Sequence, residues 1–195
     1  MGILNCPIDM KRLTRWVFTC TLLLVFVNAN CQQTASTPQF RREFLENINR
    51  TRARGCTCGV TYMPPAPPIV WNYQLELAAM GHAADMAERN YFSHTSLDGR
   101  TMQYRIGAAG YSFKGFRSYA VGENIAMGPE SISEAMEGWF KSPGHCKNLM
   151  NPGFKEVGVA ENSTYWVQDF GGRQAFSAEM QRMIKNGQVR IIERQ

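Results

Sequence analysis

The segment Glu156-Val-Gly-Val-Ala-Glu-Asn-Ser-Thr-Tyr-Trp-Val-Gln-Asp-Phe170 decides the fold class, because it contains two neighbouring strand candidates. Residues 156–160 and 165–170 are rich in the β-branched and aromatic residues that favour strands. Turn-forming residues, Asn162-Ser-Thr, separate the two runs, so the segment predicts a β-hairpin. A further strand region is expected at 119–127.

Helices are expected on both sides of these strands in the sequence. Apolar residues recur at helical spacing from Pro38, which suits a first helical position, to about Arg54. Asn72 can cap a second helix of about 20 residues whose face is rich in small side chains, which favours close packing. A short helix is expected at 101–109, and 55–68 is expected to be a loop.

The last expected helix opens with a capping box, Ser131-Ile-Ser-Glu134, and ends near Ser142-Pro-Gly144. Helices therefore alternate with a few strands, without the regular repeat of a parallel β-α-β fold. Residues 172–195 form a basic tail, for which we expect a weakly held helix or disorder.

The composition predicts one domain of ordinary size: the chain has 195 residues, of which 44% are hydrophobic and 19% charged. Its net charge of +5 is confined to the two ends. Residues 32–172 carry 13 basic and 13 acidic groups and are therefore neutral. This distribution argues against nucleic acid as a partner.

Residues 1–31 have the layout of a secretory signal peptide. Lys11, Arg12 and Arg15 precede an apolar run, 16–27, that is too short to span a membrane. Two cleavage sites remain open: an ordinary signal-peptidase site ending at Ala29, or a lipoprotein signal in which Cys31 would carry a lipid anchor. Either predicts a secreted, periplasmic or cell-envelope protein without a transmembrane helix in its mature form. Residues 32–38 would then be a polar tether.

Export makes disulfides possible among the remaining cysteines. One structural disulfide is expected, from Cys56 or Cys58 to Cys146, and this is favoured over a redox role. A four-cysteine zinc site is not supported, because Cys56-Thr-Cys58 has no second close pair.

The candidate site residues are two histidines and a glutamate near the ends of expected elements. His94 and His145 each follow an expected helix end, and Glu123 lies in Gly122-Glu-Asn-Ile-Ala126. Two imidazoles and a carboxylate are sufficient to bind zinc and leave a position open for water. Sequence spacing alone also allows them to be surface or capping residues. His82, on the apolar face of the second helix, is expected to be a packed, hydrogen-bonded core residue.

Five segments give these residues a family context; they are Asn90-Tyr-Phe-Ser-His94-Thr-Ser with Gly99-Arg100, Gly122-Glu-Asn-Ile-Ala126, Gly138-Trp-Phe-Lys-Ser-Pro-Gly-His145-Cys146, Asn151-Pro-Gly-Phe-Lys-Glu-Val-Gly158 and Tyr165-Trp-Val-Gln-Asp-Phe-Gly171. In this order and separation they resemble the CAP superfamily, or SCP-like extracellular domain, in its bacterial form. The resemblance covers about residues 39–171. It implies an α+β fold, a three-layer α-β-α sandwich with a small central sheet, and a Cys58–Cys146 disulfide.

The resemblance also implies a cleft. In eukaryotic relatives two histidines and two glutamates converge and can hold a divalent metal; His94, Glu123 and His145 match three of those positions, and Ser142 stands where the fourth carboxylate would be. Losing an anionic ligand weakens the attraction for a cation. Zinc binding by His94, His145 and Glu123 is therefore expected to be weak and to fall at low pH.

Two classes of function follow. The preferred one is a non-catalytic binding or interaction module for a small lipid or sterol-like ligand, or for a protein or envelope partner. The alternative is a metal-assisted hydrolase, peptidase-like, that uses His94, Glu123 and His145. A Cys–His nucleophile is disfavoured, because adjacent Cys146 and His145 seldom face each other and Cys146 has an expected disulfide partner.

Overall fold

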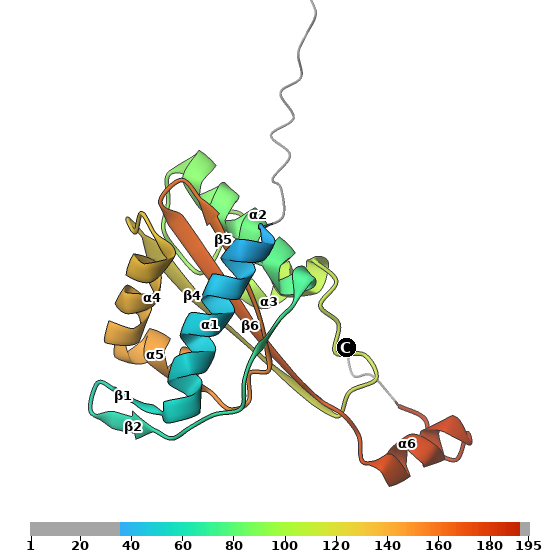
Figure 1. The fold of residues 1–195 in the computed structure, drawn as a ribbon. Coiled ribbons are helices and arrows are strands. Elements are labelled where there is room, and N and C mark those ends of the chain that lie inside the picture. The colour runs from blue at the N-terminus through green and yellow to red at the C-terminus, as the bar shows by residue number, and fades with distance from the viewer. Residues whose placement is uncertain (1–35, 192–195) are drawn as a thin grey trace, which may run out of the picture. The chain divides into compact units, whose positions relative to one another are not determined.

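The structure is a computed structural model that describes residues 36–191 (Figure 1). The expected signal peptide, its cleavage sites, Cys31 and most of the tether lie outside these residues. The helices are α1 (Pro38–Arg54), α2 (Tyr73–Arg89), α3 (Met102–Ala108), α4 (Ile132–Lys141), α5 (Pro143–Met150) and α6 (Ala178–Lys185). The strands are β1 (Cys56–Cys58), β2 (Thr61–Met63), β3 (Val70–Trp71), β4 (Ser118–Met127), β5 (Glu156–Asn162) and β6 (Tyr165–Gln174). A search of this part of the chain finds no helix of the length and apolarity that a membrane span needs.

The central sheet has four strands in the order β3-β5-β6-β4. The predicted hairpin is confirmed as β5 and β6, which pair antiparallel, and the predicted third strand is β4, which pairs antiparallel with β6. The two-residue strand β3 pairs parallel with β5. β6 continues to Gln174, beyond the expected domain limit at residue 171, because it pairs with β4 as far as Ser118. β4 is therefore a long edge strand.

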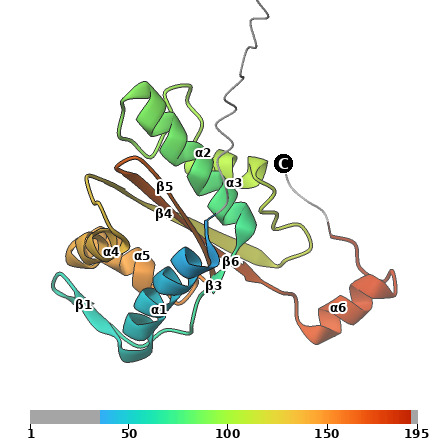
Figure 2. The same ribbon diagram turned by 45° about the horizontal axis from the view of Figure 1, so that its top comes forward.

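Helices cover both faces of this sheet, which confirms the α-β-α sandwich (Figures 1 and 2). On one face, the small residues of α2 pack against Ile125, Ala160 and Val167 of the three long strands. On the other face, α1, α4 and α5 enclose an aromatic core that includes Phe44, Trp139, Trp166 and Phe170. Residue alternation along each strand sends its side chains to these two layers in turn.

The close approach of α2 that the small residues predict is most extreme at Gly158. A Cβ atom there would lie 1.9 Å from the backbone nitrogen of Glu76, at the start of α2. The missing side chain thus lets the helix rest directly on β5, and it fixes the distance between the helical layer and the sheet.

Two expectations for the chain between the main elements were wrong. Residues 55–68 are not only a loop, because β1 and β2 form an antiparallel hairpin there. α4 ends at Lys141, as expected, but Pro143 opens a second helix, α5, where its missing N–H has no partner to lose. His145 consequently lies inside a helix and not beyond a helix end.

Arg52 holds the C-terminal end of α5 in place. Its guanidinium is fully buried and donates to the carbonyl oxygens of Leu149 (2.7 Å), Asn151 (3.1 Å) and Phe154 (3.0 Å). Burial lowers the pKa of Arg52 to about 10. These bonds join α1 to the segment that carries His145.

Within the basic tail, residues Ala178–Lys185 form the helix α6, none of whose residues is buried.

Candidate functional site

Edge strand β4 places the candidate site at the border of the two helical layers. Glu123 and Asn124 are neighbours on β4 and face opposite sides of the sheet. His94, in the loop after α2, contacts Glu123, and its Nδ1 lies 2.7 Å from Glu123 Oε1. The backbone carbonyl of His145, on α5, accepts a hydrogen bond from Asn124 Nδ2 at 3.3 Å.

Both carboxylate oxygens of Glu123 are engaged. Oε1 accepts from His94, and Oε2 accepts from Nη2 of Arg105 on α3 at 2.6 Å. The side chain of Glu123 is only 1% exposed. Burial alone would raise the pKa of Glu123, but the hydrogen bond from His94 and the charge of Arg105 together hold it below its usual value. Glu123 is therefore a buried anion with two partners.

His94 is oriented by these contacts and remains open to solvent. Because Nδ1 faces the carboxylate, the neutral imidazole places its proton on Nδ1, which leaves the Nε2 lone pair free. The side chain of His94 is 56% exposed, whereas that of Glu123 is buried. Arg105 Nη1 also donates to the backbone carbonyl of His94 at 3.0 Å. The arrangement presents one imidazole nitrogen outward.

His82, on α2, holds the loop that carries His94 through a hydrogen bond. It is fully buried, as predicted, and its Nε2 donates to the carbonyl of Ser93, the residue before His94, at 2.8 Å. Burial is the largest cause that lowers the pKa of His82, so the neutral ring is favoured. His82 is thus a positioning residue for the His94 loop.

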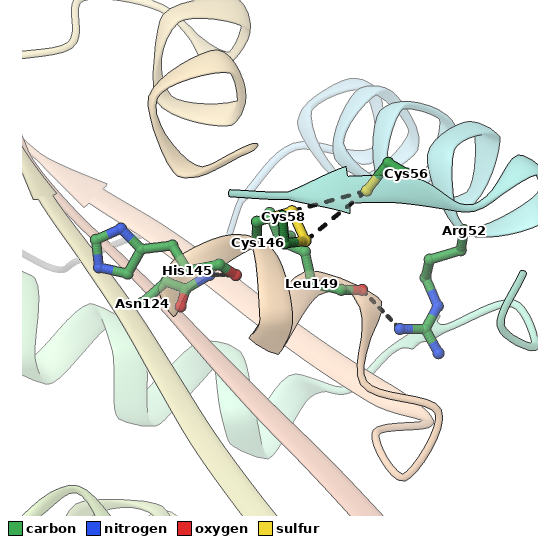
Figure 3. The surroundings of a disulfide bond; sticks show 7 residues. All are labelled: Arg52, Cys56, Cys58, Asn124, His145, Cys146 and Leu149. Atoms are coloured by element: carbon green, nitrogen blue, oxygen red, sulfur yellow. Dashed lines mark hydrogen bonds between the residues drawn. A yellow bond between two sulfur atoms is a disulfide. The ribbon is translucent and has the colours of Figure 1, made fainter. Parts of the chain in front are cut away.

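His145 comes from the helical layer on the other face of the sheet. Asn148, one turn further along α5, donates from Nδ2 to Asn124 Oδ1 at 2.9 Å and to the backbone carbonyl of Glu123 at 3.2 Å. These bonds attach α5 to β4. Burial, and then the charge of His94, lower the pKa of His145. Figure 3 shows its ring pointing away from the disulfide of Cys146.

The structure adds two charged residues that the sequence analysis did not single out. Arg105 is buried and pairs with Glu123. Asp169 lies directly opposite Glu123 in the β4–β6 pairing, is fully buried, and neither of its carboxyl oxygens accepts a hydrogen bond within the described part of the chain. Burial, and then the charge of Glu123, raise the pKa of Asp169 well above its usual value. A carboxylate within a predicted strand that is rich in apolar residues is the signal that could have identified it.

The donor set allows a metal to bind through imidazole nitrogens. His94 Nε2 and the ring of His145 have no hydrogen-bond partner within residues 36–191, whereas each carboxylate oxygen of Glu123 already accepts a hydrogen bond. Within residues 36–191, the one group of three side chains whose ligand atoms all lie within 4.8 Å of one another is Cys56, Cys58 and Cys146. Ser142 is half-buried at the junction of α4 and α5. Its place in a cleft with the other three stays a prediction.

The predicted disulfide pairing is present. Cys58, on β1, is bonded to Cys146, on α5, and Cys56 has a free thiol. Of the two partners that the sequence left open for Cys146, the structure therefore uses Cys58. The bond attaches the β1–β2 hairpin to the helix that carries His145.

Comparisons with known proteins agree with this architecture. The uncharacterized protein YkwD of Bacillus subtilis is 33% identical over 108 residues, which cover 54% of this chain and 40% of YkwD. The crystal structure of an extracellular protein containing an SCP domain, from Bacillus anthracis, has a TM-score of 0.56 and 30% identity. That match covers 70% of this chain and 44% of the other.

An outer surface protein of Borrelia burgdorferi shares the fold, with a TM-score of 0.56 at 22% identity over 71% of this chain and 96% of that one. The chain spans less than half the length of YkwD and of the Bacillus anthracis protein. The profile of the CAP, or cysteine-rich secretory protein, family matches residues 45–170. This chain belongs to the cysteine-rich secretory protein (CAP) family.

Proposed function

We propose that this protein is an exported, non-catalytic binding module whose cleft presents His94 and His145 to a divalent cation or a polar ligand group. The observation that carries the proposal is the state of Glu123. Its carboxylate is buried and both oxygens have partners, so it orients His94 and is not free to take a proton from water. A general base must reach the proton that it abstracts. The geometry therefore supports binding over hydrolysis.

His94 and His145 would hold the cation, and Glu123 would act through His94. A carboxylate that accepts from one imidazole nitrogen fixes the ring and raises the basicity of the other nitrogen. Bound in the cleft, a divalent cation would supply a positive coordination point for an anionic or carbonyl group of a ligand. The positive charge of Arg105 next to Glu123 repels a metal cation, and this supports weak metal binding.

A small lipid or sterol-like molecule is the ligand class that a second feature favours. The segments 113–119 and 176–191 line an open hollow of about 620 Å³. Its apolar lining includes the stacked rings of Phe113 and Tyr119 and the side chains of Phe176, Met180 and Ile184. Such a hollow can accept an apolar chain or ring, as binding sites of this size commonly do. A protein or envelope partner is the other class that the family context allows.

Zinc titration calorimetry tests the cleft, using exported protein in which Cys58 and Cys146 remain bonded, so that their thiolates are not available. We expect weak binding to the wild type and none to His94→Ala or His145→Ala. Glu46→Gln, which changes an exposed carboxylate on α1, is the control and should bind as the wild type does. Binding that persists in both histidine variants would place the metal elsewhere.

A second measurement separates the module from the enzyme. Wild type and His145→Ala are assayed against peptide and ester panels, and in parallel against lipid and peptidoglycan panels for saturable binding. The module predicts binding without turnover. Hydrolysis that is lost in His145→Ala would contradict the proposal and favour the metal-assisted hydrolase. The intact mass of the exported protein tests whether residues 1–29 or 1–30 have been removed. An added diacylglycerol mass on Cys31 would show a lipid anchor.

A further inference from the structure

Three cysteine sulfur atoms lie together between β1 and α5. Cys58 Sγ and Cys146 Sγ are bonded, and the free Cys56 Sγ lies 3.7 Å from Cys146 Sγ and 3.9 Å from Cys58 Sγ (Figure 3). Cys56 and Cys58 are two residues apart on β1, so their side chains project from the same face of the strand. The free sulfur therefore lies beside the disulfide, almost equally far from both of its atoms.

We propose that Cys56, Cys58 and Cys146 form a thiol–disulfide exchange site in which Cys56 can replace Cys58 as the partner of Cys146. The Cys56 thiolate attacks Cys146 Sγ, so a Cys56–Cys146 bond forms as the Cys58–Cys146 bond breaks. The electron pair of the broken bond leaves on Cys58 Sγ, which takes up the proton that Cys56 lost. No sulfur is oxidised or reduced overall, and the step needs no further reagent.

Strand geometry selects Cys146 as the sulfur that changes partner. Cα atoms two residues apart on a strand are about 6.6 Å from each other, near the upper limit for a disulfide. A Cys56–Cys58 bond would therefore require β1 to bend. Cys146 approaches from a different element, and its Cα lies 5.5 Å from that of Cys58. Attack at Cys146 leaves the strand extended and requires the Cys56 sulfur to move from the side of the disulfide into line with the Cys146–Cys58 bond.

The surroundings give the three sulfurs different access to solvent. Cys58 and Cys146 are 1% and 0% exposed, whereas Cys56 is half-buried. Cys56 also lines a surface hollow of about 440 Å³, together with Thr51, Thr57 and three residues of α4, Glu137, Phe140 and Lys141. A small thiol or disulfide can therefore reach the trio only through Cys56. After exchange, the free thiol is the buried Cys58, which is shielded from such reagents.

Exchange would alter the attachment of the site helix. Cys146 directly follows His145 on α5, and the disulfide moves its anchor on β1 by two residues, about 6.6 Å along the strand. The exchange site stands independently of the proposed cleft function, because it involves none of the cleft side chains.

Differential alkylation of the full exported protein tests the proposal. Native protein is held at pH 8 for hours without added thiol, quenched with acid, denatured, alkylated and fragmented to locate the label within Cys56-Thr-Cys58. We expect the label to be shared between Cys56 and Cys58, because the exchange involves no net oxidation or reduction and both pairings are populated. Label that stays on Cys56 alone throughout would overturn the proposal.

A variant gives a second, independent result. In Cys58→Ser, oxidised glutathione should produce a Cys56–Cys146 bridge, seen as one cross-linked peptide pair. Two glutathione adducts without that bridge would contradict the proposal. Cys56→Ser is the matched control, and it should keep Cys58–Cys146 and show no label at either position. If Cys58→Ser does not fold, the wild-type alkylation alone decides.

Discussion

The guanidinium of Arg105 and the carboxylate of Glu123 form an ion pair within the protein, with Nη2 2.6 Å from Oε2 and the side chains 4% and 1% exposed. A buried pair of this kind is costly to break, because removing one partner leaves the other charge without compensation. The pair also joins α3 to β4 and places Glu123 against His94. Structure and site thus depend on the same contact.

Glu123→Gln should lower the free energy of unfolding by about 3 kcal/mol, because Arg105 keeps its charge and loses its anionic partner. Urea unfolding at neutral pH measures the change. The control is the same substitution at Glu46, whose pair with Arg42 is 4.0 Å long and exposed, and there the change should stay below about 0.5 kcal/mol. Equal effects in the two variants would show that the buried pair has no special weight.

Asp169→Asn should raise the free energy of unfolding at pH 7 by about 1 kcal/mol or more, because the amide removes a buried carboxyl that accepts no hydrogen bond from any described residue and lies opposite Glu123. Thermal and urea unfolding both report it. Asp98→Asn, at an exposed carboxylate bound to Arg100, should bring no gain. A clear loss of stability in Asp169→Asn would mean that the carboxylate is needed in its charged form.

Glu156 gives the protein a dependence on acid. Burial would raise the pKa of Glu156, but hydrogen bonds from Tyr111, Arg173 and Asn72 lower it. A carboxyl with a lowered folded pKa contributes stability above its unfolded pKa, and this contribution is lost as pH falls through the folded value. Glu156→Gln should therefore flatten the fall in melting temperature below about pH 4.5. A wild-type and variant profile that run parallel over that range would refute this origin.

Gly158→Ala should destabilise the fold by about 3 kcal/mol, because its Cβ would lie 1.9 Å from the backbone nitrogen of Glu76, which cannot move without shifting α2. Gly81→Ala is the control. Gly81 lies in α2, the helix that Gly158 contacts, and no atom lies within 4 Å of the new Cβ there. That change should stabilise the protein by about 0.5–1 kcal/mol, since alanine favours helix. Chemical unfolding of both variants compares close packing with helix propensity directly.

Much of the fold could be predicted from local pattern. Helical spacing and capping residues located α1, α2 and α4, and a turn between two β-rich runs located the β5–β6 hairpin. These features depend on neighbours in the chain, which the sequence displays directly. The short strands of 55–68 and the helix α5 escaped prediction, because proline and glycine mark a turn and a first helical turn alike.

The sequence by itself determined the candidate residues and the family context. Only the tertiary structure decided which side chains meet: that Glu123 pairs with Arg105, that Asp169 lies across from it, and that Cys56 lies beside a disulfide. The physical reason is that such contacts join residues far apart in the chain. Their proximity follows from how α2, α3 and α5 pack on the sheet, and no local spacing encodes it.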